Sequence, residues 1–120
     1  MVPNVLYEEL KRVAGDGKTI IYRKAGQLVG LDIESKRDRD QLMAFLEEVN
    51  RLEHEAGRPL LSAVVVAYIQ QVPGAGFFNS AKELGVFRGR TLAQQRAFWA
   101  AERTRLREFW SKSTGSEANP

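Results

Sequence analysis

RPLLSAVVVAYIQQVPGAGFF, residues 58–78, is the stretch that decides the fold. It contains an apolar run, residues 60–69, which is interrupted only by Ser62, has three consecutive valines and leads into the glycine-bearing loop 72–76. A strand without polar alternation is usually covered on both faces. We therefore expect residues 60–69 to form the central strand of a compact α+β domain, with residues 64–66 buried from two sides. The loop after this strand is a place where a partner can meet the backbone.

The size and composition of the chain predict one domain. The 120 residues are 43% hydrophobic and 28% charged, which suits a single core. Residues 1–112 are expected to form the α+β domain, and the polar residues 113–120 are expected to form a flexible tail. The longest apolar run is half the ~20 residues needed to cross a bilayer, and the N-terminus lacks a secretory pattern. These features predict a cytoplasmic protein with no membrane contact.

Helix signals flank the predicted strand on both sides. Asn4 is a suitable N-cap for the first helix, and Ser35 with Asp38 resembles a capping box. Gly17, Gly30 and other glycines follow the apolar patterns and stop them. A short extended piece is expected over residues 18–22. The predicted helices cover residues 5–14, 23–29, 36–56, 77–84 and 92–110, and the first two give residues 5–30 a helix-turn-helix character.

Positive charge is concentrated in the second half of the chain. The net charge is +3 with a pI of about 9.4. Residues 1–60 hold ten Lys and Arg against eleven Asp and Glu, whereas residues 61–120 hold eight against four. Clustered arginine is suited to phosphate contacts and counterion release. A solvated helix face is the alternative interpretation.

Catalytic and metal-binding signals are weak. The chain has no cysteine, which excludes disulfides, thiolate metal sites and cysteine nucleophiles within it. Its one histidine, His54, lies between two glutamates in a charged helix and is interpreted as a surface residue. The loop 72–76 lacks the lysine and serine that end a nucleotide-binding loop. We therefore expect no cofactor, no metal and no catalytic residue, and an enzyme is the less favoured interpretation.

The last predicted helix carries an aromatic and arginine-rich face. Trp, Phe and Arg are enriched at protein interfaces, so this face is a candidate for a homodimer or for another protein partner. Core packing explains many of the aromatic side chains equally well. The candidate interface residues are Trp99, Arg103, Leu106 and Trp110.

Residues 17–30, GKTIIYRKAGQLVG, resemble the entry to the DNA-binding domain of alkylguanine-DNA alkyltransferases and alkyltransferase-like proteins. The likeness continues to residue 76 through a proline-led strand at Pro59 and a glycine loop at Pro73. It implies a winged-helix-like scaffold. The reactive Pro-Cys-His-Arg of that family is replaced here by Pro-Leu-Leu-Ser at 59–62, so the resemblance implies no alkyl transfer. The strand and loop are also similar to those of a small bacterial family, a likeness that implies no activity.

Two functions follow from these observations as expectations. The first is a non-catalytic DNA-binding module whose basic face positions phosphate, with residues 88–90 acting like a wing. The second is a protein-interaction or dimerisation module that uses the last helix. The nucleic-acid-binding candidates are Lys18, Tyr22, Arg23, Lys24, Arg37, Arg39, Arg88 and Arg90.

Overall fold

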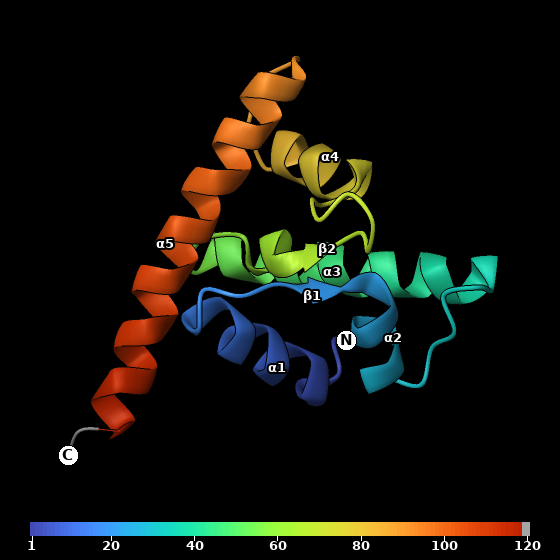
Figure 1. Cartoon of the computed structure of the whole chain (residues 1–120), viewed down its shortest axis with the longest axis horizontal. Helices are drawn as coiled ribbons and strands as arrows, with labels where there is room; N and C mark the ends of the chain where they lie inside the picture. Colours follow the sequence, from blue (N-terminus) through green and yellow to red (C-terminus); the bar gives the residue numbers. More distant parts are fainter. Residues whose placement is uncertain (119–120) are drawn as a thin grey trace.

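The computed structural model describes the backbone of residues 1–118 and the side chains of residues 1–111 (Figure 1). Within this part of the chain the fold is α+β and mostly helical, and its principal extents are 45 × 34 × 28 Å. The α-helices are α1 (Asn4–Gly15), α2 (Tyr22–Leu28), α3 (Lys36–Glu55), α4 (Ala75–Glu83) and α5 (Leu92–Ala118). The other elements are the strands β1 (Ile20–Ile21) and β2 (Val65–Val66) and the 3-10 helix η1 (Leu61–Val64). The two strands form a parallel pair with Ile20 opposite Val65 and Ile21 opposite Val66.

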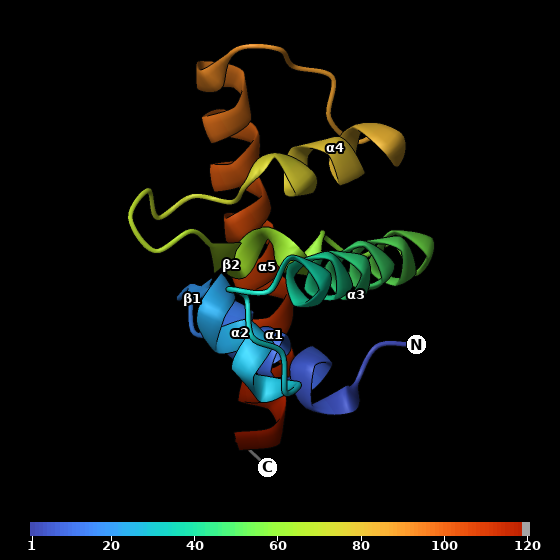
Figure 2. The same ribbon diagram turned by 90° about the vertical axis from the view of Figure 1, so that its right-hand side faces the viewer.

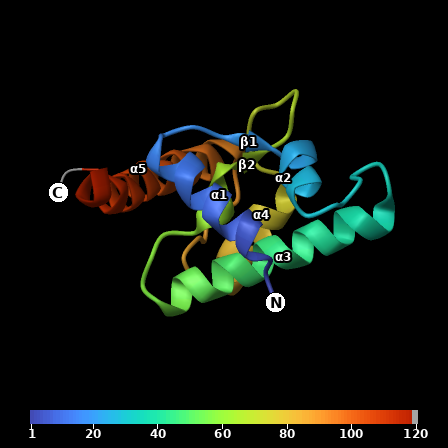
Figure 3. The same ribbon diagram turned by 90° about the horizontal axis from the view of Figure 1, so that it is seen from below.

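Residues 58–66, which we call the central segment, run through the middle of the molecule. Helices α1, α3 and α5 all contact η1 inside this segment. Figures 1 and 3 show α5 crossing one end of the molecule, with α1 and α3 on different sides of the central segment. Every residue from 60 to 66 is buried. The core is thus built around this segment, as its apolar sequence predicts.

The predicted ten-residue strand is wrong in its backbone conformation and its length. Residues 61–64 form η1, and only Val65–Val66 pair with another strand. Burial of residues 64–66 is confirmed, since each is at most 1% exposed. A buried backbone needs hydrogen-bond partners but not necessarily from a sheet. Here Trp99 Nε1 on α5 donates to the Ala63 carbonyl at 2.8 Å, so a side chain takes the place of a neighbouring strand.

The helix boundaries follow the predicted signals closely. Ser35 caps α3, and its Oγ accepts a hydrogen bond from the Asp38 amide at 3.3 Å. The Asp38 carboxylate does not complete the predicted box, because it accepts from the Asp32 amide instead. Asn4 is the first residue of α1 rather than its cap, and Pro3 precedes it. Gly17, Gly30, Gly57 and Gly85 all have positive φ after a helix, where glycine is favoured.

The winged-helix details of the prediction are not confirmed by the N-terminal helices or by the α4–α5 connection. Residues 16–21, including β1, separate α1 from α2, so no short turn joins them. Residues 86–90 lead from α4 to α5 without regular structure, and the only strand pairing in the described chain is parallel. Neither feature supplies the hairpin of a wing.

Helix α5 packs against α1 at very short range. A Cβ added to Gly15 of α1 would lie 3.2 Å from the backbone carbonyl carbon and oxygen of Trp110. Helix α5 begins where predicted, after Thr91, and it continues to Ala118 through residues that were expected to form a tail. Residues 119–120 of that predicted tail lie outside the described residues. No helix in the described part of the chain is both long and apolar enough to span a membrane.

Candidate functional site

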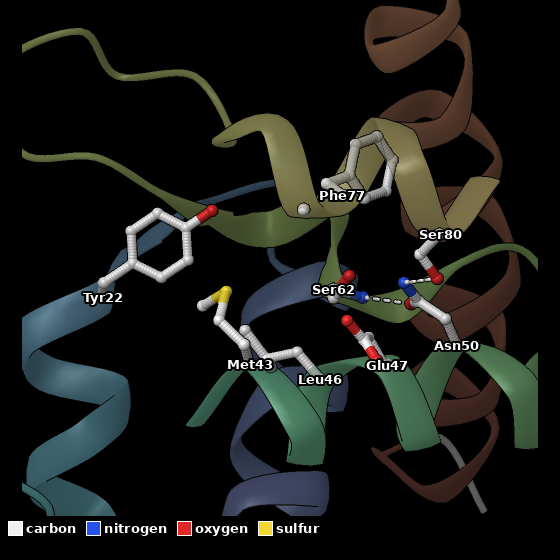
Figure 4. Close-up of a pocket in the computed structure, with 9 residues that line it drawn as sticks. Tyr22, Met43, Leu46, Glu47, Asn50, Ser62, Phe77 and Ser80 are labelled. Carbon is white, nitrogen blue, oxygen red and sulfur yellow. Dashed lines mark hydrogen bonds between the residues drawn. The ribbon is translucent and has the colours of Figure 1, made fainter. Parts of the chain in front are cut away.

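Two buried polar side chains from neighbouring helices, Asn50 and Glu102, bond to the backbone of the central segment. The Asn50 side chain of α3 accepts from the Ser62 amide at 3.2 Å and donates to Ser80 Oγ of α4 at 3.3 Å (Figure 4). The Glu102 carboxylate of α5 accepts from the Leu60 amide at 2.8 Å. Both polar side chains are almost fully buried, so each bond is made where water cannot replace it. These contacts attach the segment to α3 and α5, and Ser80 attaches the same Asn50 side chain to α4.

A groove lies between α3 and α4, with Tyr22 of α2 at one end. The Tyr22 hydroxyl accepts a hydrogen bond from the Gly74 amide, at the start of α4, at 2.8 Å. Burial raises the pKa of Tyr22, so the phenol is neutral at physiological pH. The groove has an inner part of about 10 Å³, room for about one water molecule, and an outer part of about 360 Å³. We call it the Tyr22 groove, and it is lined by Tyr22, Ile33, Arg39, Asp40, Leu42, Met43, Leu46, Glu47, Asn50, Ser62, Gly74, Ala75, Gly76, Phe77 and Ser80.

The inner end of the Tyr22 groove is polar on one wall and apolar on the others. Figure 4 shows Met43 and Leu46 rising from α3, Phe77 above them on α4, and the Asn50 amide linking Ser62 to Ser80. The hydroxyl and amide groups suit hydrogen bonding to a ligand, and the Glu47 carboxylate lines the groove beside them. Within the described residues, no three His, Cys, Asp or Glu side chains gather to hold a metal ion.

A second hollow opens on the other side of Tyr22. Its volume is about 420 Å³, and it lies beside β1 and the residues that follow β2. Most of its wall is apolar, and Arg23 is the charged residue at its edge. We call it the β1 hollow, and it is lined by Ile21, Tyr22, Arg23, Ile33, Ala67 and Tyr68.

Residues 67–72, which we call the Tyr68 loop, project from the body between β2 and α4 (Figure 2). Tyr68 and Ile69 are 74% and 83% exposed. The loop is nevertheless well ordered by its own bonds: the Ala67 amide donates to Val72 O at 3.0 Å, and the Gln71 amide donates to Ala67 O at 2.9 Å. Gln71 has φ of 56°, a left-handed conformation that closes the turn. Two large apolar side chains are thus held out in solvent by a defined turn.

The predicted DNA-binding cations do not lie together. Arg23 on α2 is paired with Glu34 at 2.7 Å, and Arg39 on α3 donates to the carbonyls of Ile33 and Glu34. Lys24 and Arg37 are exposed on the same two helices, Lys18 precedes β1, and Tyr22 bonds to α4 as described.

The other two predicted cations are at the opposite end of the molecule. Arg88 and Arg90 belong to the connection between α4 and α5, whereas α2 lies beyond the central segment from it (Figures 1 and 2). The predicted single basic face is therefore divided between two ends.

The predicted interface residues of α5 contact their own chain. Leu106 is fully buried and Trp110 is 8% exposed, and both belong to the core that α5 shares with α1. Trp99 donates to Ala63 O, and Arg103 donates to Gly17 O at 3.2 Å while its guanidinium lies 5.1 Å from the Trp99 ring centre. These four side chains thus attach α5 to the domain, which is why the helix is aromatic on this side.

A charged cluster lies where the central segment begins. The fully buried Glu53 carboxylate of α3 forms an ion pair with Arg58. Lys11 Nζ of α1 lies 5.1 Å from the ring centres of both Tyr7 and Trp110. Burial, together with the Glu53 carboxylate, raises the pKa of Tyr7 to about 12. The cluster gives the buried carboxylate a counter-ion and anchors the entrance to the segment.

The Tyr68 loop is the feature that sequence reasoning missed. Tyr68 and Ile69 end the apolar run, and the pattern placed them in a buried strand. One signal was available, because Gln70 and Gln71 interrupt the run just after them and Pro73 follows. Such polar and proline residues are typical of a turn.

Comparison of the chain with family models, curated proteins and solved structures found no match.

Proposed function

We propose that this protein is a protein-interaction module that binds its partner through the Tyr68 loop and the β1 hollow beside it. The observation that carries the proposal is the exposure of Tyr68 and Ile69, 74% and 83%, next to a largely apolar hollow. Contiguous apolar surface of this kind marks interaction sites.

The energetics of the Tyr68 loop support a contact surface. Covering one large apolar side chain contributes about 1.5–3 kcal/mol. The two backbone bonds within the loop reduce the freedom that Tyr68 and Ile69 would lose on binding, and this preorganisation improves affinity. Neither side chain is needed to fill the core, so folding alone does not account for their position.

The partner surface in this proposal differs from the one expected on α5. Leu106 and Trp110 already occupy the core, and a partner could reach them only if α5 detached from α1. The Tyr68 loop needs no such rearrangement.

Site-specific photo-crosslinking tests the proposal. A benzoylphenylalanine placed at position 68 is expected to give a discrete crosslinked species in lysate of the source organism, and Ile69→Asp is expected to abolish it. Position 92 supplies the matched control, because Leu92 is also apolar and 68% exposed but lies at the start of α5. Equal crosslinking at positions 68 and 92, or an unchanged species with Ile69→Asp, would contradict the proposal. Light scattering then distinguishes self-association from a different partner.

Nucleic-acid binding is the second candidate, and one contact favours it. Arg103 and Arg107 of α5 both reach Gly17, so two arginines lie beside the residue that precedes the exposed Lys18. We call Lys18, Arg103 and Arg107 the cationic cluster. In this proposal the cluster contacts phosphate, and α1 and α2 act as the helix pair that lies against the DNA, with β1 between them in sequence.

Fluorescence anisotropy with a labelled DNA duplex tests the second candidate. Binding is expected at low salt and should weaken steeply as salt rises, because counterions are released. Lys18→Ala with Arg107→Ala should weaken it, while Arg88→Ala with Arg90→Ala should not. No saturable binding at low salt would exclude this function.

A further inference from the structure

Strand β1 has one unpaired edge. The sheet consists of β1 and β2 alone, so within the described chain only one edge of β1 is hydrogen-bonded to a strand. Figure 3 shows β1 on the outer side of β2, with the Tyr68 loop rising beside it. Residues 19–21 are each half-buried, so the chain does not cover this part of the strand completely. An open edge of this kind can accept an added strand.

The start of this edge is positively charged. Arg103 donates to the Gly17 carbonyl, and a Cβ at Gly17 would lie 3.0 Å from Arg107 Cδ, so both arginines adjoin the residue before Lys18. No ion pair of the described residues involves Lys18, Arg103 or Arg107.

Two acidic side chains on either side of β1 are paired with other cations. Asp16 is paired with Arg12 at 3.0 Å, and Glu34 is paired with Arg23 at 2.7 Å. The cationic cluster is therefore available to an incoming carboxylate.

The end of the same edge is apolar. Ile21 of β1 enters the β1 hollow, whose other walls include Ile33 and Tyr68. Side chains alternate across a strand, so a segment lying along β1 could direct an apolar residue into this hollow while other residues remain outside. Charge at one end and an apolar hollow at the other give the edge two different recognition points.

We propose that the open edge of β1 binds an extended acidic segment of a partner protein as an added strand. Carboxylates of the segment would lie at the cationic cluster, and an apolar side chain would enter the β1 hollow against Tyr68. This inference rests on the proposed protein-interaction function and specifies the chemistry of the partner. A second copy of the chain is disfavoured, because two of the carboxylates near its own β1, Asp16 and Glu34, are already paired.

A defined peptide tests this inference directly. The probe is a fluorescein-labelled eight-residue peptide of alternating glutamate and valine, and binding is followed by anisotropy at low salt. Saturable binding is expected, and the lysine–valine counterpart should not bind. Methylation of alternate backbone nitrogens should weaken binding by about tenfold or more, since strand addition needs those N–H groups. Equal binding of the methylated peptide would overturn strand addition.

Charge reversal supplies the matched pair of variants. Lys18→Glu with Arg107→Glu should weaken binding by about tenfold or more, whereas Arg88→Glu with Arg90→Glu, the same change of charge far from β1, should change it less than about twofold. Circular dichroism confirms that each variant is folded. Equal losses of peptide affinity in the two variants would show that only the net charge of the protein matters, and this would overturn the proposed site.

The crosslinking experiment at position 68 separates the two proposals. Crosslinking at Tyr68 without any binding of the acidic peptide would overturn this inference and leave the interaction function standing. Peptide binding without the crosslink would support the β1 edge and contradict the role of the Tyr68 loop.

Discussion

The central segment and the Tyr68 loop are consecutive in the chain and share one apolar run, residues 60–69, but they have opposite environments. Val65 and Val66 are fully buried, whereas Tyr68 and Ile69 are among the most exposed large side chains of the molecule. The backbone of the central segment is hydrogen-bonded to side chains of two helices, α3 and α5, while the bonds of the loop in the described chain lie within the loop itself. The contrast separates apolar residues that stabilise the fold from apolar residues that remain available for binding.

Truncation inside the central segment is expected to have the largest effect. Leu61→Ala should lower the free energy of unfolding by about 2–5 kcal/mol, because Leu61 is fully buried and its loss leaves a cavity. Urea denaturation followed by circular dichroism measures this change. A loss below about 1 kcal/mol would mean that the segment is less tightly packed than its burial indicates.

Removal of one hydrogen-bonding side chain is expected to cost less. Asn50→Ala leaves the buried Ser62 amide without its acceptor, which should reduce stability by about 1–3 kcal/mol. Asn79→Ala on α4 is the matched control, since Asn79 is exposed and should change stability by less than about 0.5 kcal/mol. Similar losses in both variants would show that the Asn50 bonds do not matter.

Alkaline pH should lower the free energy of unfolding through Tyr7, which lies in the charged cluster where the central segment begins. The pKa of Tyr7 is raised from 10.0 to about 12 in the folded protein, so folding favours the neutral phenol. This stabilisation is complete below pH 10 and is lost as the pH rises towards 12. Stability measured across this range should fall less steeply for Tyr7→Phe than for the natural chain. Tyr22→Phe should retain the Tyr7 contribution, and identical profiles for Tyr7→Phe and the natural chain would contradict the prediction.

Changes in the Tyr68 loop should have the smallest effect on stability. Tyr68→Ser with Ile69→Ser should alter the free energy of unfolding by less than about 0.5 kcal/mol, because both side chains are solvated in the folded chain. The same double variant should lose partner binding. A large loss of stability would place these residues with the central segment and remove the contrast between the two regions.

The sequence predicted the helices well because their signals are local. Ser35 and the glycines at 17, 30, 57 and 85 act through their own backbone or that of near neighbours, so a single sequence reveals them. Burial of residues 64–66 was equally predictable from their apolar character.

The conformation of the central segment was not predictable in the same way. Its hydrogen-bond partners, Asn50, Trp99 and Glu102, lie outside the segment in the sequence, and no residue pattern near the segment predicts these bonds. A β-branched run therefore predicted a strand where most residues form η1 or a turn.

The candidate site could be anticipated only at single residues. Tyr22 was expected to matter, but its bond to Gly74, its place between two hollows and the separation of the predicted cations depend on the tertiary fold. Tyr68 and Ile69 were missed because an exposed apolar residue and a buried one look alike in sequence.

The close packing at Gly15 makes the whole centre of the molecule depend on a missing methyl group. An alanine there would act as a wedge against the Trp110 backbone, and α5 would have to tilt or slide to make room. Trp99 and Glu102 belong to that helix, so a shift of α5 would also weaken their hydrogen bonds to the Ala63 carbonyl and the Leu60 amide. The absence of a side chain at Gly15 thereby determines how closely α5 can pack against α1, and so where its side chains meet the central segment.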